Sequence, residues 1–171
     1  MSPPVPIGFY RVVNWASKTC LDVENDKPAK GTPLVGWKVD ESRTSQVWRL
    51  TSDSVLTHVN TGLKLAEDPA AAQPENDVAI VLNDAPGMWV YNPGTEAGTW
   101  VFKVYNVNYF MDLESGSDEN GTSVRIWKRP DNNPQPQNLW TFQPAKDPKG
   151  GDKPDDNGGS TGGALPPTQT P

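Results

Sequence analysis

The stretch CLDVENDKPAKGTPLVGWKVDESRTSQVWRL, residues 20–50, decides the fold of this chain. It contains short apolar runs separated by polar loops that are rich in Gly, Pro, Asp and Ser. The runs have the length of strands, and the loops have the composition of turns. Its last run carries the tripeptide Gln46-Val47-Trp48, and comparable runs recur twice further along the chain. We therefore expect this stretch to belong to one unit of a threefold repeat.

Three segments of five residues mark the start of each unit, because each alternates apolar and polar residues as a half-buried strand does. They are YRVVN at 10–14, LTHVN at 56–60 and FKVYN at 102–106. The last residues of these segments are Asn14, Asn60 and Asn106. Since 60 − 14 and 106 − 60 both equal 46, the units are aligned on these asparagines.

The rest of each unit supplies three more strands. The second strands are expected at 21–23, 63–65 and 111–113, the third at 33–37, 78–82 and 123–127, and the fourth at 46–50, 87–91 and 138–142. Four strands in each of three units make twelve, and the frequent Pro and Gly leave no run with a helical period. This pattern predicts an all-β fold, a pseudo-threefold β-trefoil. A three-bladed propeller is the competing arrangement, but propellers typically have four or more blades.

The composition sets the limits of this domain. We expect the trefoil at 8–145, with repeats at about 8–52, 53–94 and 95–145, after an N-terminal extension of residues 1–7. Residues 146–171 contain one large aliphatic residue and no aromatic one. Such a segment buries too little apolar surface to offset its ordering entropy, so a disordered tail or linker is expected.

Charge and apolar content narrow the choice of partners. The net charge of −6 disfavours nucleic acid, whose phosphates repel an acidic protein. The longest apolar run, residues 78–82, is too short to cross a bilayer, and no membrane insertion is expected. The N-terminus has no signal-peptide pattern, and Cys20 is the single cysteine. A cytoplasmic protein, or one secreted without a signal peptide, is therefore expected.

Several motifs resemble one known family. These are the QVW triplet at 46–48, the LDV strand at 21–23, the GTP turn at 31–33, and Trp37 placed fifteen residues after Asp22. Over residues 8–145 they resemble the ricin B-type (R-type) lectins, and the low cysteine content is most like the fungal members. The resemblance implies a β-trefoil that binds carbohydrate.

The resemblance also implies a sugar site in the first repeat. Asp22 would accept hydrogen bonds from two neighbouring sugar hydroxyls, and Trp37 would pack against the apolar face of the sugar ring. Gln46 would hold the carboxylate in place. Ser45 stands where the family usually has an asparagine that donates to a hydroxyl, and Gly36 next to Trp37 is included in the site.

The third repeat carries a comparable set of residues. Asp112 and Trp127 have the same separation, since 127 − 112 and 37 − 22 both equal 15. The later pair reads Gln137-Asn138, so the two amides are exchanged, and Arg125 is counted with the site. The repeat therefore has the residue types that a second sugar site requires.

The basic residues around this third-repeat site are Arg125, Lys128 and Arg129. They are expected to form a solvated rim. The second repeat has Lys64 in place of the carboxylate and Leu82 in place of the aromatic residue, so it is expected to lack a site.

The predicted function is that of a lectin for galactose or N-acetylgalactosamine glycans on glycoproteins or glycolipids, with a homodimer left open as an alternative arrangement. No cofactor or metal is expected. The acidic pair formed by Asp22 and Glu24 could suit catalysis, but such a pair on a strand edge is usually a solvated face, and no enzyme activity is predicted. The rival function is protease inhibition through the exposed loop 67–77.

The remaining conspicuous residues have structural interpretations. The tryptophans of the fourth strands, Trp48, Trp89 and Trp140, occur in every repeat and are expected in the core. Cys20 is expected to be a small buried apolar residue. His58 has no catalytic partner at a suggestive spacing, so a surface or strand position is expected.

Overall fold

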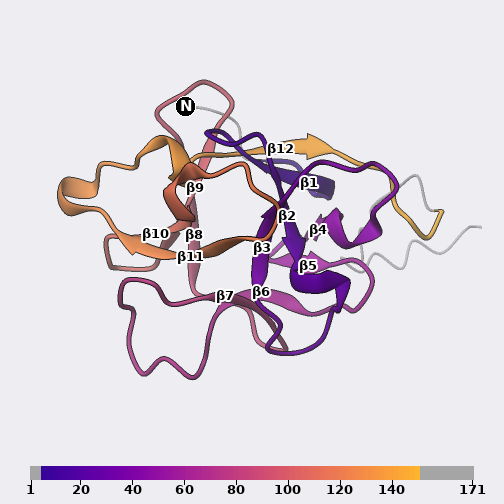
Figure 1. Cartoon of the computed structure of the whole chain (residues 1–171), viewed down its shortest axis with the longest axis horizontal. Helices are drawn as coiled ribbons and strands as arrows, with labels where there is room; N and C mark the ends of the chain where they lie inside the picture. Colours follow the sequence, from indigo (N-terminus) through magenta and orange to yellow (C-terminus); the bar gives the residue numbers. More distant parts are fainter. Residues whose placement is uncertain (1–4, 151–171) are drawn as a thin grey trace, which may run out of the picture.

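The described part of the chain forms twelve short strands, four in each repeat (Figure 1). The structure is a computed structural model that describes residues 5–150. The strands are β1 (Gly8–Asn14), β2 (Cys20–Val23), β3 (Leu34–Trp37), β4 (Trp48–Leu50), β5 (Leu56–His58), β6 (Lys64–Glu67), β7 (Ile80–Asn83), β8 (Trp89–Pro93), β9 (Trp100–Val104), β10 (Tyr109–Leu113), β11 (Thr122–Lys128) and β12 (Trp140–Pro144). The predicted all-β trefoil of three four-strand repeats is confirmed.

Short 3-10 turns are the helical elements of the described chain. They are η1 (Glu24–Asp26), η2 (Thr44–Gln46), η3 (Glu114–Gly116), η4 (Pro130–Asn132) and η5 (Pro136–Asn138). Within residues 5–150 no helix has the length and apolarity that crossing a membrane requires. The tail predicted at 146–171 falls mostly outside the described residues.

The first and fourth strands of the repeats form the barrel. Antiparallel ladders join β1 to β4, β4 to β5, β8 to β9, β9 to β12, and β12 to β1. Figure 1 shows β12 lying along β1, which brings the two ends of the domain together. Among the described residues no ladder joins β5 to β8. Repeat two is therefore the side on which the barrel is less tightly closed.

The second and third strands of each repeat form a hairpin, and each hairpin contacts the next repeat. The side chain of Asn120, in repeat three, accepts a hydrogen bond from the backbone amide of Lys38 at 2.7 Å. Asn76, in repeat two, accepts one from the amide of Lys128, also at 2.7 Å. These contacts hold the loops beside the third strands of repeats one and three.

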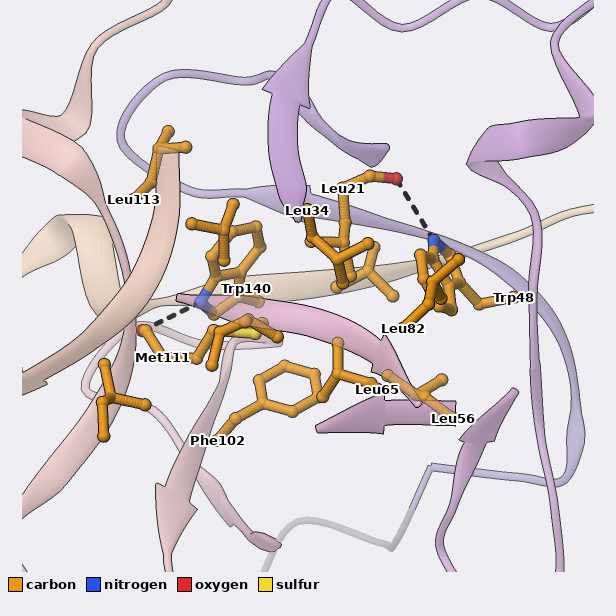
Figure 2. Packing of buried hydrophobic residues seen from close by; sticks show 14 of the residues in the cluster. Leu21, Leu34, Trp48, Leu56, Leu65, Leu82, Phe102, Met111, Leu113 and Trp140 are labelled. Carbon is orange, nitrogen blue, oxygen red and sulfur yellow. Dashed lines mark hydrogen bonds between the residues drawn. The ribbon is translucent and has the colours of Figure 1, made fainter. Parts of the chain in front are cut away.

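The core lies between the barrel and the hairpins, and tryptophans anchor it (Figure 2). The indole Nε1 of Trp48 donates to the carbonyl of Leu21 at 3.2 Å, and that of Trp140 donates to Met111 at 3.4 Å. Both rings are fully buried. Trp89 makes the corresponding bond in repeat two at 3.3 Å but is only half-buried. The predicted core positions are confirmed, with the weakest burial in repeat two.

The strand ladders correct the alignment of the repeats. The residues that face the three core tryptophans across their ladders are Asn14, His58 and Val104. The structural spacings are thus 44 and 46, from 58 − 14 and 104 − 58. The asparagine alignment was wrong by two residues between repeats one and two, whereas its spacing of 46 between repeats two and three is confirmed. Asn60 and Asn106 lie in turns after their strands, where asparagine is favoured for its own local hydrogen bonding.

Two single residues take buried positions. Cys20 has no exposed surface, and burial raises the pKa of its thiol to about 12. This confirms that it is a packed residue and not a reactive thiol. His58 lies in β5, buried edge-on against Trp48 with ring centroids 5.3 Å apart. Burial lowers the pKa of His58, so its neutral form is favoured.

Candidate functional site

The first-repeat site is built on a fully buried carboxylate. Asp22 lies in β2 and has no exposed surface. The Nε2 of Gln46 donates to its Oδ2 at 3.1 Å and to the carbonyl of Lys38 at 2.9 Å. The Oε1 of Gln46 accepts from the amide of Asp40 at 3.0 Å. Gln46 therefore holds Asp22 with all of its amide groups in use, which leaves the side chain a single orientation.

An arginine that the sequence did not indicate covers this carboxylate. Arg43 Nη2 lies 3.1 Å from Asp22 Oδ2, and its Cζ lies 5.2 Å from the ring centroid of Trp37. The guanidinium thus contacts both the carboxylate and the aromatic ring that were expected to face a sugar. In this conformation Arg43 occupies the position that the sequence predicted for a sugar.

Two further residues of the predicted first site have other roles. Ser45 is buried, and among the described residues its hydroxyl has no hydrogen-bond partner. Gly36 is buried too, and a Cβ there would lie 2.8 Å from both Leu113 and Thr19. Gly36 is thus required for the close approach of Leu113 from repeat three. Neither residue presents a polar group to a ligand in this conformation.

The third-repeat site repeats the carboxylate and its amide support. Asp112 lies in β10 and is nearly fully buried. Asn138 Nδ2 donates to its Oδ2 at 2.9 Å. Because Asn138 precedes Trp140 as Gln46 precedes Trp48, Asn138 is the equivalent of Gln46. The exchange of amides that the sequence suggested is therefore present, and an asparagine supports the carboxylate here where a glutamine does so in repeat one.

Arginines close this second carboxylate more completely than Arg43 closes the first. Arg129 Nη2 lies 2.6 Å from Asp112 Oδ2, and its Nε donates to Asn138 Oδ1 at 2.8 Å. Arg125 Nε lies 3.7 Å from Asp112 Oδ1. Burial raises the pKa of Asp112, although both arginines and Asn138 act to lower that pKa.

Arg125 and Arg129 do not form the solvated rim that was predicted. Their side chains are only 13% and 16% exposed. Arg125 also pairs with Asp77 at 2.7 Å and Glu114 at 3.1 Å, and its Cζ lies 4.5 Å from the Trp127 ring centroid. A buried carboxylate requires a counter-ion, and here the chain supplies two.

Among the described residues, no hydrogen bond or ion pair joins Gln137 to Asp112. Its backbone carbonyl accepts a hydrogen bond from Asn14 Nδ2 at 3.0 Å, so its main chain joins repeat three to repeat one. Its side chain is half-buried. The structure thus brings together Asp112, Asn138, Arg125 and Trp127, and leaves Gln137 beside this group.

Repeat two lacks both the carboxylate and the aromatic residue, as predicted. The residues that stand in their positions are not the predicted ones. The indole bonds make Leu65 the equivalent of Leu21, so Ala66 and not Lys64 stands in place of Asp22. Across the hairpin Leu65 faces Leu82 as Leu21 faces Gly36, which puts Asn83 in place of Trp37. The conclusion that no carboxylate and aromatic pair exists there is unchanged.

Sequence reasoning missed Arg43 and placed Arg129 in a solvated rim instead of on the carboxylate. The two arginines stand at different positions relative to the support residues. Arg43 lies three residues before Gln46, whereas Arg129 lies nine before Asn138. A common spacing could not have found them. The one indication in the sequence was an aspartate in a buried strand, because a carboxylate inside a core needs a cation nearby.

The three-repeat geometry agrees with comparisons against known proteins. The sequence model of the family described as Ricin-type beta-trefoil lectin domain-like matches residues 3–83 and 44–127. The chain belongs to this family. Curated protein sequences give no match. The predicted ricin B-type identity is therefore confirmed at the level of the domain family.

Solved structures share the fold of this ricin-type domain. The Rhizoctonia solani agglutinin has a TM-score of 0.70 and 20% identity, over 84% of this chain and 99% of that chain. The Macrolepiota procera ricin B-like lectin, in complex with lactose, has a TM-score of 0.69 and 20% identity, over 83% of this chain and 99% of that chain. The designed threefold-symmetric protein ThreeFoil has a TM-score of 0.68 and 19% identity, over 80% of this chain and 98% of that chain. At these identities the likeness shows the fold.

Proposed function

We propose that this protein is a lectin without enzyme activity that binds galactose- or N-acetylgalactosamine-type glycans in repeats one and three. The observation that carries the proposal is a recurring arrangement. Asp22 with its supporting amide lies in the strand that pairs with the strand of Trp37, and Asp112 has the same relation to Trp127. The second repeat lacks both members.

The chemistry of the arrangement suits a sugar. A carboxylate accepts hydrogen bonds from neighbouring hydroxyls, each worth roughly 1.5–3 kcal/mol when the acceptor is charged. An aromatic ring removes the apolar face of the sugar from water. The hydrogen bond from Gln46 keeps the Asp22 carboxylate oriented when no sugar is bound. The Macrolepiota lectin, which shares the fold, is in complex with lactose, a galactose-containing disaccharide.

Ligand binding in repeat one requires Arg43 to move. Asp22 has no exposed surface while Arg43 covers it, whereas the Arg43 side chain is itself 24% exposed. The Nε of Arg43 is buried without a hydrogen-bond partner in the described residues, so this position costs the arginine a bond. Sugar hydroxyls would replace the guanidinium on Asp22, and the ring of Trp37 would be freed.

Repeat one is the stronger candidate of the two. Asp112 is held by Arg129 and Arg125, and Arg125 has two further acidic partners. Opening the third-repeat site therefore breaks more ion pairs than opening the first. We rank binding in repeat one above binding in repeat three for this reason.

The test is a glycan array followed by calorimetric titration with lactose. Asp22→Asn combined with Asp112→Asn is expected to abolish binding, and Asp22→Asn alone to remove most of it. Asp26→Asn is the matched control, because Asp26 is exposed in the adjacent turn and has a φ of 53° that asparagine tolerates. Binding by the double variant at wild-type strength would overturn the proposal.

A second measurement isolates the covering arginine. Arg43→Ala leaves Asp22 and Trp37 in place and removes the competing cation. Lactose affinity is expected to rise about threefold to tenfold, as the loss of an ion pair worth roughly 1 kcal/mol implies. A fall in affinity would show that Arg43 holds the sugar and does not exclude it.

A further inference from the structure

Repeat two contains a pocket of about 370 Å³ beside the loop that follows β6. Most of its lining is apolar. The apolar side chains nearest the core are Val78, Val104, Val107 and Ile126, and those at the surface are Met88 and Tyr105. A volume of this size lies at the lower end of the range of about 300–1,000 Å³ that small-molecule sites occupy.

A carboxylate stands in this pocket at a position that is apolar in the other repeats. Glu67 is the equivalent of Val23 and Leu113, both of which are buried in the core. Glu67 is half-buried, and burial raises its pKa. A charged side chain at a core position destabilises a domain unless something compensates it. Such a residue in a cleft is a candidate for function.

A glycine makes room for this carboxylate. Gly87 stands two residues before Trp89, where repeat one has Gln46 two residues before Trp48. A Cβ on Gly87 would lie 2.4 Å from Glu67 Oε2 and 2.3 Å from Trp89 Nε1. The space that an amide side chain fills in the other repeats is therefore next to a carboxylate here.

Glu67 differs from the other two carboxylates in having no counter-ion. Asp22 pairs with Arg43, and Asp112 pairs with Arg129. Within residues 5–150 no arginine, lysine or histidine forms an ion pair with Glu67. The second ionisable acid of the lining is Asp68, and the lining contains no basic side chain. The pocket is thus apolar with a net negative charge.

We propose that this pocket binds a small organic cation, a primary ammonium on an apolar body, with Glu67 as its counter-ion. In repeats one and three an arginine of the chain pairs with the buried carboxylate, Arg43 with Asp22 and Arg129 with Asp112. For Glu67 the part of the chain that the structure describes provides none, and an external cation takes that role. The valines and Ile126 would receive the apolar body of the ligand.

The rim of the pocket favours such a ligand. Met88 and Tyr105 are 66% and 54% exposed, which makes them two of the three exposed large apolar side chains in the described chain. Tyr105 offers an aromatic face, which attracts organic cations. The ligand would cover both side chains. This inference does not depend on the sugar sites of repeats one and three.

The experiment uses the whole chain labelled with nitrogen-15 and benzylamine as the probe. Benzylamine is expected to shift the indole N–H resonance of Trp89 saturably, since that group lies beside Glu67. Benzyl alcohol has the same shape without the charge and is expected to bind at least tenfold more weakly. Equal binding of the alcohol would overturn the proposal.

Glu67→Gln tests the counter-ion directly, because it keeps the shape and removes the charge. Benzylamine affinity is expected to fall about tenfold or more. Glu75→Gln is the matched control, since Glu75 is exposed on the same loop and does not line the pocket. Unchanged affinity in Glu67→Gln would overturn the assignment.

Discussion

The carboxylate sites of repeats one and three and the pocket of repeat two use the same backbone fold but balance their charges differently. In repeats one and three an arginine covers the buried carboxylate and contacts or approaches a tryptophan. In repeat two Glu67 lies in an apolar pocket, and none of the described residues supplies it with a cation. A pseudo-symmetric backbone therefore does not determine the charge balance of the equivalent sites in its repeats. Individual side chains determine that balance, so single substitutions can test it.

The largest expected effect concerns the tryptophans that all three repeats share. Trp48→Ala and Trp140→Ala should each lower the free energy of unfolding by about 3–5 kcal/mol, because each removes a fully buried ring. Trp89→Ala should cost clearly less, since its ring is half-buried where the barrel is less closed. Urea denaturation measures all three. An equal loss for Trp89→Ala would contradict the view that repeat two is the weaker side.

The next effect separates the two covered carboxylates. Asp112→Ala is expected to destabilise the fold by about 3 kcal/mol, because it leaves Arg125 and Arg129 without their buried partner. Asp22→Ala should cost less, since it leaves one arginine that is more exposed. Asp118→Ala, at an exposed position, serves as the control. A larger loss for Asp22→Ala would reverse the ranking of the two sites.

A stabilising change is expected in repeat two. Glu67→Leu restores the apolar residue type that Val23 and Leu113 supply in the other repeats. The free energy of unfolding should rise by about 1 kcal/mol, a modest value because Glu67 is half-buried. Thermal unfolding at neutral pH measures it, alongside ligand binding, which the same change should abolish. A destabilised Glu67→Leu would show that the carboxylate supports the fold.

The pH dependence of stability offers a related measurement with a defined sign. Burial raises the pKa of Glu67 in the folded state above its value in the unfolded chain. Above this raised pKa the folded state bears the cost of a charged buried group, and that cost is relieved as the pH falls through it. The stability of wild type relative to Glu67→Gln should therefore increase on acidification. A constant difference across this pH range would contradict the raised pKa.

The smallest effect concerns the buried hydroxyl of the first site. Ser45→Ala should change stability by no more than about 0.5 kcal/mol, or raise it, because that hydroxyl has no partner among the described residues. Lactose affinity should be unchanged as well. Weaker lactose binding by this variant would show that Ser45 reaches the sugar after Arg43 moves.

Much of the fold was predictable because it depends on local patterns. Alternating strands, turn residues and the recurring tryptophans indicated twelve strands in three repeats. The alignment of repeat two was not predictable in the same way. Lys64 seemed to match Asp22, but the indole bond from Trp89 to Leu65 shows that Ala66 does. The alignment of the second strands depends on which backbone carbonyl accepts the hydrogen bond of each core tryptophan. That bond joins strands that are far apart in the sequence.

The candidate site was predictable in its carboxylates and less so in their surroundings. Asp22 and Gln46 were paired correctly, as their hydrogen bond shows. Arg43, the pairing of Arg129 with Asp112 and the apolar pocket around Glu67 were not anticipated. Their positions depend on loops from different parts of the chain, whose lengths vary between repeats.

The sequence by itself determined the trefoil, its core tryptophans and the carboxylates that recur with them. These features follow from periodicity and residue type, which are local properties of the chain. Only the tertiary structure decided which of these acids receive an arginine and that Glu67 has no ion pair within residues 5–150. Ion pairing depends on distance in space and on exclusion of water. Both are set by packing between segments far apart in the sequence.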